Sequence, residues 1–121
     1  MTKILLVEDD ATMISLLTTL LDIEGYKVIR MPEDKPEQIM DLLLREKPSL
    51  VLLDVNLKGM NGFDLLRQIR QSPELPHIRV IMSSGMDYRD QCLERGADGF
   101  IMKPYMPDDL IRMMRQALVG V

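Results

Sequence analysis

Acidic, hydroxyl and amine side chains follow separate apolar runs in this chain. In order they are Glu8 and Asp9, then Asp54, then Ser84, and finally Lys103. Three carboxylates in one crevice repel one another unless a cation lies among them, and oxygen ligands with room for water suit Mg²⁺, or Mn²⁺ in its place. The amine and the hydroxyl would bind oxygens of a phosphoryl group, which an Asp carboxylate can accept covalently. Together these residue types predict a metal-assisted phosphoryl site.

Each of these residues taken alone has a simpler explanation. An acidic pair after a strand often caps a helix, and Ser-Gly and Lys-Pro pairs are common in turns. What favours a shared site is that the acidic pair, Asp54, Ser84 and Lys103 each stand at the end of a different apolar run.

The residues can meet only if the runs before them are strands of one parallel sheet. The run before Asp54, at 50–53, is apolar throughout, as in a strand buried on both faces. Strands are expected at 4–7, 27–30, 50–53, 79–83 and 99–102, alternating with helices near 13–21, 39–44, 63–69, 88–95 and 107–118. This alternation predicts an α/β fold, in which right-handed crossovers place all the strand ends at one edge of the sheet. Asp34 and Glu37 have the spacing of a capping box before the second helix.

The bulk properties fit a single domain, 1–121, of ordinary globular composition. The net charge of −4 gives no basic footprint for nucleic acid and no polybasic patch for a membrane. The apolar runs are strand-sized and no signal peptide is apparent, so we expect neither a membrane span nor secretion. The single cysteine, Cys92, excludes an internal disulfide and suits a reducing compartment, which predicts a cytoplasmic location.

Longer motifs surround the chemical residues. They occupy residues 4–10, 52–62, 80–85 and 96–104, and read ILLVEDD, LLDVNLKGMNG, VIMSSG and GADGFIMKP. In combination they make the chain resemble, over essentially its whole length, the receiver domain of two-component response regulators, including single receivers of the chemotaxis and sporulation types. The resemblance implies a flavodoxin-like, doubly wound sheet of five parallel strands in the order 2-1-3-4-5, with helices on both faces.

The resemblance implies a role for each acidic residue. Asp54 corresponds to the phosphoacceptor, and Glu8 and Asp9 correspond to the acidic pair. Asp9 would bind Mg²⁺ directly, together with Asp54 and the backbone carbonyl of Asn56, whereas Glu8 would act through water. Asp10 lies one place beyond the pair, and we expect it to cap the first helix.

The resemblance also assigns the residues around the phosphoryl group. Ser84 matches the switch hydroxyl, Lys103 would pair with a phosphoryl oxygen, and the Lys103–Pro104 bond matches one that is usually cis. Phe100 matches the aromatic residue that turns inward as the hydroxyl moves. The alternative for Phe100 is an ordinary core residue.

Two features of this sequence concern regulation. Asn56 and Met86 flank the site at positions that tune phosphate lifetime, and an apolar Met86 would guide water poorly, which predicts slow loss of phosphate. Between Ser84 and Gly96 the chain is a few residues shorter than is usual in the family. We therefore expect the fourth helix to be short or irregular.

By resemblance, Asp54 would take its phosphoryl group from the phosphohistidine of a sensor histidine kinase or a histidine phosphotransfer protein. Phosphorylation would shift the face formed by the fourth helix, the fifth strand and the fifth helix, so that the domain is a signalling switch rather than an enzyme. The output partner, an output domain beyond Val121 and a homodimer formed on phosphorylation are left open. Nucleic-acid binding by this domain is not expected.

Three alternative functions fit the sequence less well. Two of them require residues that the chain lacks, and the third requires an incomplete phosphorylation site. A pseudo-receiver that only binds proteins predicts a broken site, but all five chemical residues are present. A metal-dependent hydrolase would want a second acid at position 56, which is Asn. A flavin-binding electron carrier would want a phosphate loop rich in hydroxyls and glycine after the first strand, where Glu8 and two further acids stand instead.

Overall fold

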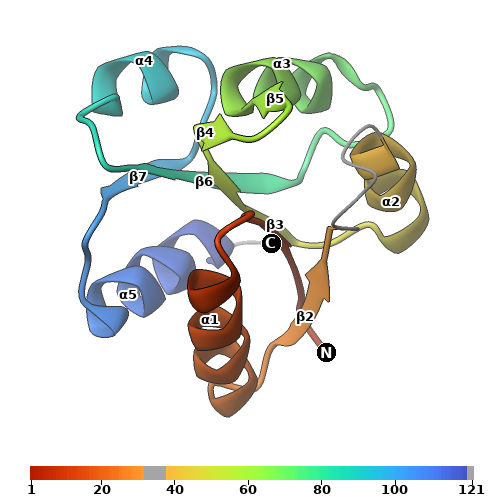
Figure 1. Cartoon of the computed structure of the whole chain (residues 1–121). Helices are drawn as coiled ribbons and strands as arrows, with labels where there is room; N and C mark the ends of the chain where they lie inside the picture. The colour runs from red at the N-terminus through yellow and green to blue at the C-terminus, as the bar shows by residue number, and fades with distance from the viewer. Residues whose placement is uncertain (32–37, 120–121) are drawn as a thin grey trace.

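A five-stranded parallel sheet forms the centre of the computed structural model, which describes residues 1–31 and 38–119 (Figure 1). In spatial order its strands are β2 (Lys27–Arg30), β1 (Lys3–Val7), β3 (Leu50–Asp54), β6 (Arg79–Ser84) and β7 (Gly99–Met102). Every neighbouring pair runs parallel. Counted among these five strands in chain order, this is the flavodoxin-like order 2-1-3-4-5 that the resemblance implied.

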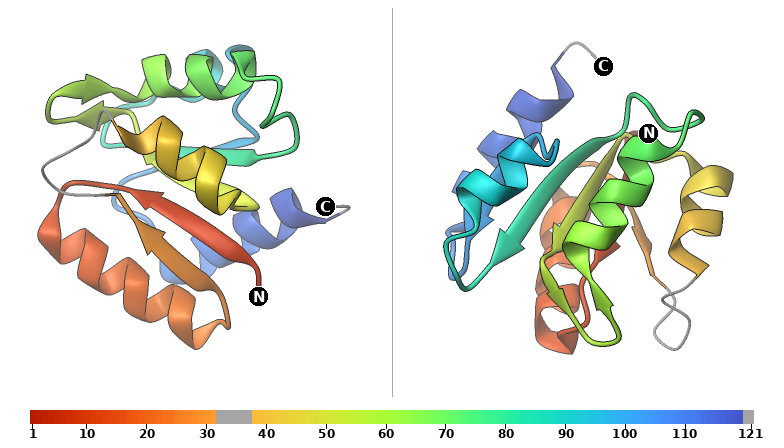
Figure 2. Two further views of the ribbon diagram at one scale, coloured as in Figure 1. Left: turned by 90° about the vertical axis from the view of Figure 1, so that its right-hand side faces the viewer. Right: turned by 90° about the horizontal axis from the view of Figure 1, so that it is seen from above.

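The α-helices of the described residues cover both faces of the sheet (Figures 1 and 2). On one face lie α1 (Ala11–Ile23) and α5 (Pro107–Leu118). On the other face lie α2 (Ile39–Glu46), α3 (Gly62–Gln71) and α4 (Arg89–Glu94). The predicted doubly wound α/β fold is therefore confirmed.

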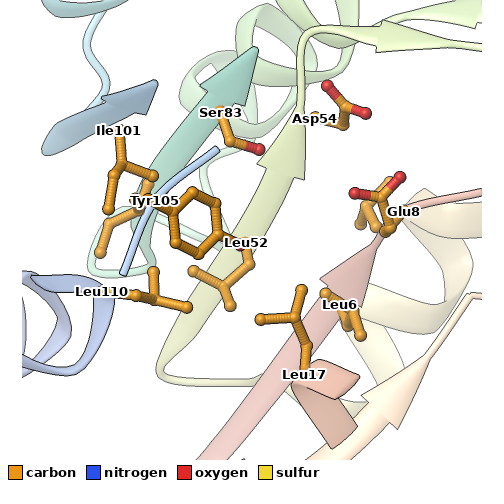
Figure 3. A pocket seen from close by; sticks show the side chains of 11 residues that line it. Leu6, Glu8, Leu17, Leu52, Asp54, Ser83, Ile101, Tyr105 and Leu110 are labelled. Atoms are coloured by element: carbon orange, nitrogen blue, oxygen red, sulfur yellow. The ribbon is translucent and has the colours of Figure 1, made fainter. Parts of the chain in front are cut away.

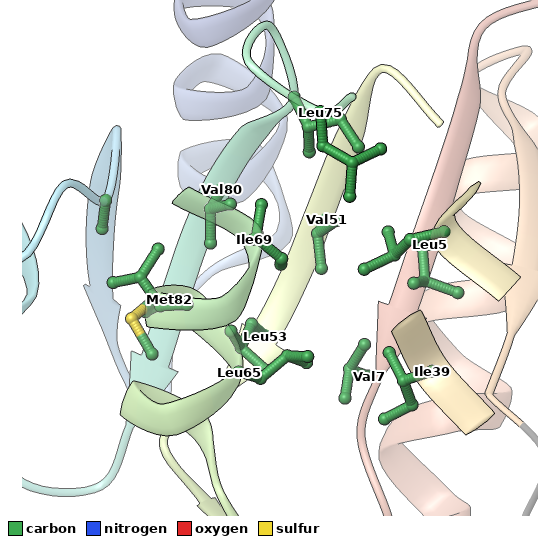
Figure 4. Close-up of a cluster of buried hydrophobic side chains, with 14 of the residues drawn as sticks. Leu5, Val7, Ile39, Val51, Leu53, Leu65, Ile69, Leu75, Val80 and Met82 are labelled. Carbon is green, nitrogen blue, oxygen red and sulfur yellow. The ribbon is translucent and has the colours of Figure 1, made fainter. Parts of the chain in front are cut away.

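Side-chain alternation along the strands divides the core into two clusters. In β3, Leu50 and Leu52 pack toward α1 and α5, whereas Val51 and Leu53 pack toward the helices of the opposite face. Figure 4 shows part of the second cluster, in which side chains of α2 and α3 meet those of the strands. Because both faces are covered, β3 is buried along its whole length, as its unbroken apolar run predicted.

Local signals in the sequence set where helices begin and end. Asp10 is the N-cap of α1, and its carboxylate accepts the backbone N–H of Met13 at 3.0 Å, as expected. After α1, Gly25 takes a φ of +89°, which glycine adopts without steric cost. The predicted capping box of Asp34 and Glu37 lies outside the described residues.

Two elements near the sheet edge differ from the pattern expected of the sequence. A small antiparallel hairpin, β4 (Asn56–Leu57) and β5 (Met60–Asn61), directly follows β3 and was not predicted. The fourth helix is short, as expected, and its six residues form a narrower segment than the 88–95 predicted. None of the described helices is long and apolar enough for a membrane span.

Candidate functional site

The carboxyl ends of four strands bring the predicted chemical residues together. Glu8 follows β1, Asp54 ends β3, Ser84 ends β6, and Lys103 follows β7. The Nζ atom of Lys103 lies 2.8 Å from Oε1 of Glu8 and 3.0 Å from Oδ2 of Asp54. One ammonium group therefore bridges carboxylates carried by two neighbouring strands.

Burial of these side chains changes the pKa values of the cluster. Glu8 and Asp54 are only 5% and 8% exposed. Burial raises the pKa of the Asp54 carboxyl above its ordinary value; hydrogen bonding and charge from Lys103 oppose this rise, and the charge of Glu8 adds to it. Burial would by itself lower the pKa of Lys103, but its contacts with Glu8 and Asp54 outweigh burial and raise that pKa. Lys103 is thus held in its charged form between the two carboxylates.

A third carboxylate completes an acidic cluster. Carboxylate oxygens of Glu8, Asp9 and Asp54 all lie within 4.8 Å of one another. An all-oxygen set of this size suits a hard divalent cation. The second oxygen of Glu8 accepts the backbone N–H groups of Asp9 and Asp10, at 3.1 and 3.2 Å. Both oxygens of Glu8 are therefore engaged within the protein.

The hairpin β4–β5 reaches over this cluster from the end of β3. The backbone N–H of Lys58, in its turn, donates to Oδ2 of Asp9 at 2.6 Å. The backbone N–H of Asn56 donates to Oδ1 of Asp54 at 3.3 Å. Gly62 follows the hairpin, and a Cβ atom there would collide with the carbonyl oxygen of Asp54. The acidic cluster and the hairpin are thus tied by backbone contacts that residue types alone do not predict.

The Ser84 hydroxyl lies at the same edge and is 1% exposed. Its Oγ accepts the side-chain amide of Asn56 and the backbone N–H of Met86, each at 3.1 Å. The Met86 side chain is 60% exposed, so only its backbone enters the cluster. Ser84 and Asn56 therefore lie together as predicted, although their direct contact was not expected.

Phe100 lies in the hydrophobic core on β7, with the guanidinium of Arg89 5.7 Å from its ring centre. An inward switch aromatic and an ordinary core Phe would both be found in this position. Three residues further on, the Lys103–Pro104 peptide bond is cis, as the resemblance implied. Lys103 itself lies in the turn after β7, and its ammonium group contacts the carboxylates of Glu8 and Asp54.

A small cavity of about 10 Å³ lies beneath the carboxylates of Glu8 and Asp54, where Tyr105 joins apolar side chains from the strands, α1 and α5 (Figure 3). Burial raises the pKa of the Tyr105 phenol to about 12, so the ring adds no charge near the site at neutral pH. A cavity of this size has room for about one water molecule. Tyr105 was not predicted as a site residue, because a tyrosine after Lys-Pro carries no distinctive spacing.

Comparison with known proteins agrees with this geometry. The response regulator receiver domain family matches residues 4–115. The transcriptional regulatory protein CpxR of Escherichia coli strain K12 is 39% identical over 118 residues, which cover 98% of this chain and 50% of CpxR. The DNA-binding response regulator MtrA of Mycobacterium leprae is 36% identical over 118 residues, with 96% and 51% of the two chains covered. The chain thus spans about half the length of these relatives.

Solved structures show the same relationship. The BeF₃-activated N-terminal receiver domain of RstA from Klebsiella pneumoniae is 30% identical, with a TM-score of 0.85 and coverage of 98% of this chain and 100% of that one. The signal receiver domain of a signal transduction histidine kinase from Syntrophus aciditrophicus is 34% identical, with a TM-score of 0.86 and coverage of 100% and 92%. With its parallel sheet, its acidic edge and these relatives, the chain belongs to the receiver domains of two-component response regulators.

Proposed function

We propose that Asp54 is the phosphoacceptor of this receiver, and that its donor is a phosphohistidine on a sensor histidine kinase or a histidine phosphotransfer protein. The observation that carries the proposal is the nearly buried Asp54 carboxylate, 3.0 Å from the Lys103 ammonium and within a cluster of three carboxylates. A pseudo-receiver would have no use for this arrangement. The chain is then a signalling switch that catalyses its own modification, and not an enzyme acting on other substrates.

The transfer is a displacement at phosphorus. A carboxylate oxygen of Asp54 forms a bond to phosphorus while the P–N bond of the phosphohistidine breaks. The electron pair of that bond stays on the ring nitrogen, and a proton on the other nitrogen makes the leaving group a neutral imidazole. Water later attacks the acyl phosphate, which releases inorganic phosphate and restores the Asp54 carboxylate.

We infer that the acidic cluster holds Mg²⁺, or Mn²⁺ in its place. Its ligands would be the carboxylates of Asp9 and Asp54 and the backbone carbonyl of Asn56. Glu8 would act through water, which agrees with the engagement of both its oxygens by Lys103 and by backbone N–H groups. When bound, the ion would offset negative charge on the phosphoryl oxygens.

The remaining residues act on the phosphoryl group and on the signal. Lys103 would exchange part of its contact with Asp54 for a phosphoryl oxygen, and Ser84 would donate its hydroxyl proton to another. Phe100 would follow the movement of Ser84. The result would be a change in the surface formed by α4, β7 and α5, which we propose as the output face.

The names of the relatives suggest the wider setting. CpxR is a transcriptional regulatory protein and MtrA is a DNA-binding response regulator, and each is about twice as long as this chain. We propose that this receiver works in the cytoplasm and controls an output of that kind. Any contact with DNA would then come from residues other than those of this receiver, whose net charge is −4.

Intact-mass measurement after incubation with Mg²⁺ and acetyl phosphate tests the proposal. The wild-type chain should gain one phosphoryl group, and Asp54→Asn should gain none. Asp64→Asn is the matched control, because Asp64 is an exposed acid on α3 that pairs with Arg67 away from the cluster. A wild-type chain that stays unmodified, or an Asp54→Asn chain modified as fast as wild type, would contradict the proposal.

A further inference from the structure

One residue contacts both the nucleophile and the hydroxyl of the site. Asn56 donates its backbone N–H to Oδ1 of Asp54, and its side-chain amide to Oγ of Ser84, 28 residues further along the chain. Asn56 itself lies on β4, at the exposed surface. Its position is therefore fixed by the hairpin and not by the core.

The two contacts at Ser84 decide what its hydroxyl can do. A serine hydroxyl has one proton to donate and two lone pairs that accept. The Asn56 amide and the Met86 backbone N–H both donate to Oγ, each at 3.1 Å. Since both accepting sites are in use and the residue is 1% exposed, the hydroxyl has only its proton left to offer.

We propose that Asn56 is a positioning residue, whose side-chain amide orients the Ser84 hydroxyl as a donor toward a phosphoryl oxygen on Asp54. This inference rests on the proposed function and adds a specific route for Asn56, which acts through Ser84 and not by direct contact with the phosphoryl group or by excluding water. Without the amide, one lone pair of Ser84 is free, and the hydroxyl can rotate to satisfy it elsewhere. The backbone N–H of Asn56 would be unaffected by a change of side chain.

Asn56→Ala isolates this role, because it removes the side-chain amide and keeps the N–H that faces Asp54. The probe is beryllium fluoride with Mg²⁺, a phosphoryl analogue whose fluorine atoms accept hydrogen bonds without any reaction. Its affinity is measured by NMR titration for wild type, Asn56→Ala, Ser84→Ala and the double variant. The matched control is Asn61→Ala, since Asn61 pairs with Asn56 across the hairpin but its side chain accepts the N–H of Phe63.

Asn56→Ala should weaken the affinity about 3- to 10-fold, the range for one neutral hydrogen bond. In the Ser84→Ala background the same change should have no further effect, because the group that it orients is gone. Asn61→Ala should bind as wild type does. Without any ligand, the side-chain amide signals of Asn56 should shift and exchange faster in Ser84→Ala.

Equal weakening by Asn56→Ala in both backgrounds would overturn the inference, since Asn56 would then act without Ser84. The inference would also be overturned if the side-chain amide signals of Asn56 were the same in Ser84→Ala as in wild type. A wild-type chain that binds no beryllium fluoride is a different failure: it contradicts the proposed function, and the inference falls with it.

Discussion

Burial and charge act in opposite directions on the Asp54 carboxylate. Loss of water disfavours its ionised form, and the negative charge of Glu8 adds to this, whereas Lys103 favours ionisation. Burial is the largest of these effects, so the folded-state pKa of Asp54 lies above the ordinary 3.8. The folded chain therefore binds this proton more tightly than the unfolded chain does. The contribution of Asp54 to stability is greatest below pH 3.8 and is lost as the pH rises through the folded-state pKa.

The raised pKa of Asp54 leads to a prediction for the stability of Asp54→Asn. At neutral pH the amide removes a poorly solvated charge, so in the absence of divalent metal the variant should unfold at a higher temperature than wild type. The difference should shrink as the pH falls through the folded-state pKa of Asp54, which lies above 3.8, because the wild-type carboxyl then takes up its proton. Thermal unfolding of both chains across this pH range checks it. A wild-type chain that is the more stable of the two at neutral pH would show that Lys103 outweighs burial.

Met86 gives a second prediction at this scale. Its exposed side chain has no N–H or O–H group to donate to a water molecule approaching the acyl phosphate, and its Sδ accepts the hydroxyl of Tyr88 at 3.6 Å. Met86→Gln should therefore shorten the phosphate lifetime about 3- to 10-fold, the effect of one added hydrogen bond. The lifetime is followed by intact mass after removal of acetyl phosphate. Met106→Gln, at another exposed methionine, should leave the lifetime unchanged, and an unchanged lifetime in Met86→Gln would refute the role of position 86.

Residue types and spacing could predict the acidic cluster, because each of its members stands at the end of an apolar run. They could not predict how those members pair. The bridge from Lys103 to Glu8 depends on the turn after β7, and the contact of Asn56 with Ser84 joins residues 28 positions apart. Such contacts are set by the relative placement of loops, on which an apolar pattern carries no information.

Among the elements, the hairpin β4–β5 was the least predictable. Its strands have two residues each, too few for the alternation that identifies a strand. Its one local signal is the turn at Lys58-Gly59, where Gly59 takes a φ of +77°. Backbone contacts to Asp9 and Asp54 then hold it in place, together with the partly buried side chains of Leu57 and Met60, which pack against the core.

Gly62 tests whether the hairpin must close tightly against β3. A Cβ atom at this position would meet the Asp54 carbonyl oxygen and the Val55 Cα, which are backbone atoms that cannot turn aside. Gly62→Ala should therefore lower the free energy of unfolding by about 1–3 kcal/mol, as overpacking does. Chemical denaturation measures the change.

Gly85→Ala is the control for Gly62→Ala. A Cβ atom at Gly85 would have no neighbour within 4 Å, and its backbone avoids positive φ, so this variant should be as stable as wild type. If the two variants had the same free energy of unfolding, the hairpin would be able to move away from β3 without loss of stability.

That α4 is short was predictable, because the sequence has few residues between Ser84 and Gly96, although its six residues are fewer than the 88–95 expected. How it is anchored was not. Tyr88, just before α4, packs edge-on against Phe63 of α3, with ring centres 5.8 Å apart. Arg95, just after it, stacks over the same ring at 4.5 Å. Contacts at the two ends of α4 thus attach it to α3, since only Cys92 of its six residues is buried.

For the whole molecule, the alternation of strand and helix patterns predicted a parallel α/β sheet, whereas the order of its strands came from the resemblance to receiver domains. The carboxyl ends of the five strands reach the same edge of the sheet because all five strands run parallel. The two hydrophobic clusters pack against opposite faces of the sheet, and β3 contributes side chains to each of them. The sheet therefore holds three carboxylates within 4.8 Å of one another, and Lys103 contacts two of them, Glu8 and Asp54.

This arrangement predicts that Mg²⁺ stabilises the folded chain. An ion that binds only the native cluster adds about 2.7 kcal/mol of stability at a hundred times its dissociation constant. The unfolding temperature of wild type should thus rise with Mg²⁺ concentration, and Asp9→Asn should lose most of the rise. Asp10→Asn should keep it, because Asn caps α1 as well as Asp does. An equal rise in Asp9→Asn and wild type would place the ion elsewhere.

The proposed function requires that the phosphoryl group resides on Asp54. The most direct test is borohydride reduction of the phosphorylated chain, which converts an acyl phosphate to an alcohol and so turns a phosphorylated Asp into homoserine. Trypsin then releases the peptide 46–58, in which Asp54 is the single Asp. Fragment-ion mass spectrometry should find homoserine at position 54. Homoserine at Asp9 or Asp10 instead, or an unreduced Asp54 in a chain that carries phosphate, would contradict it.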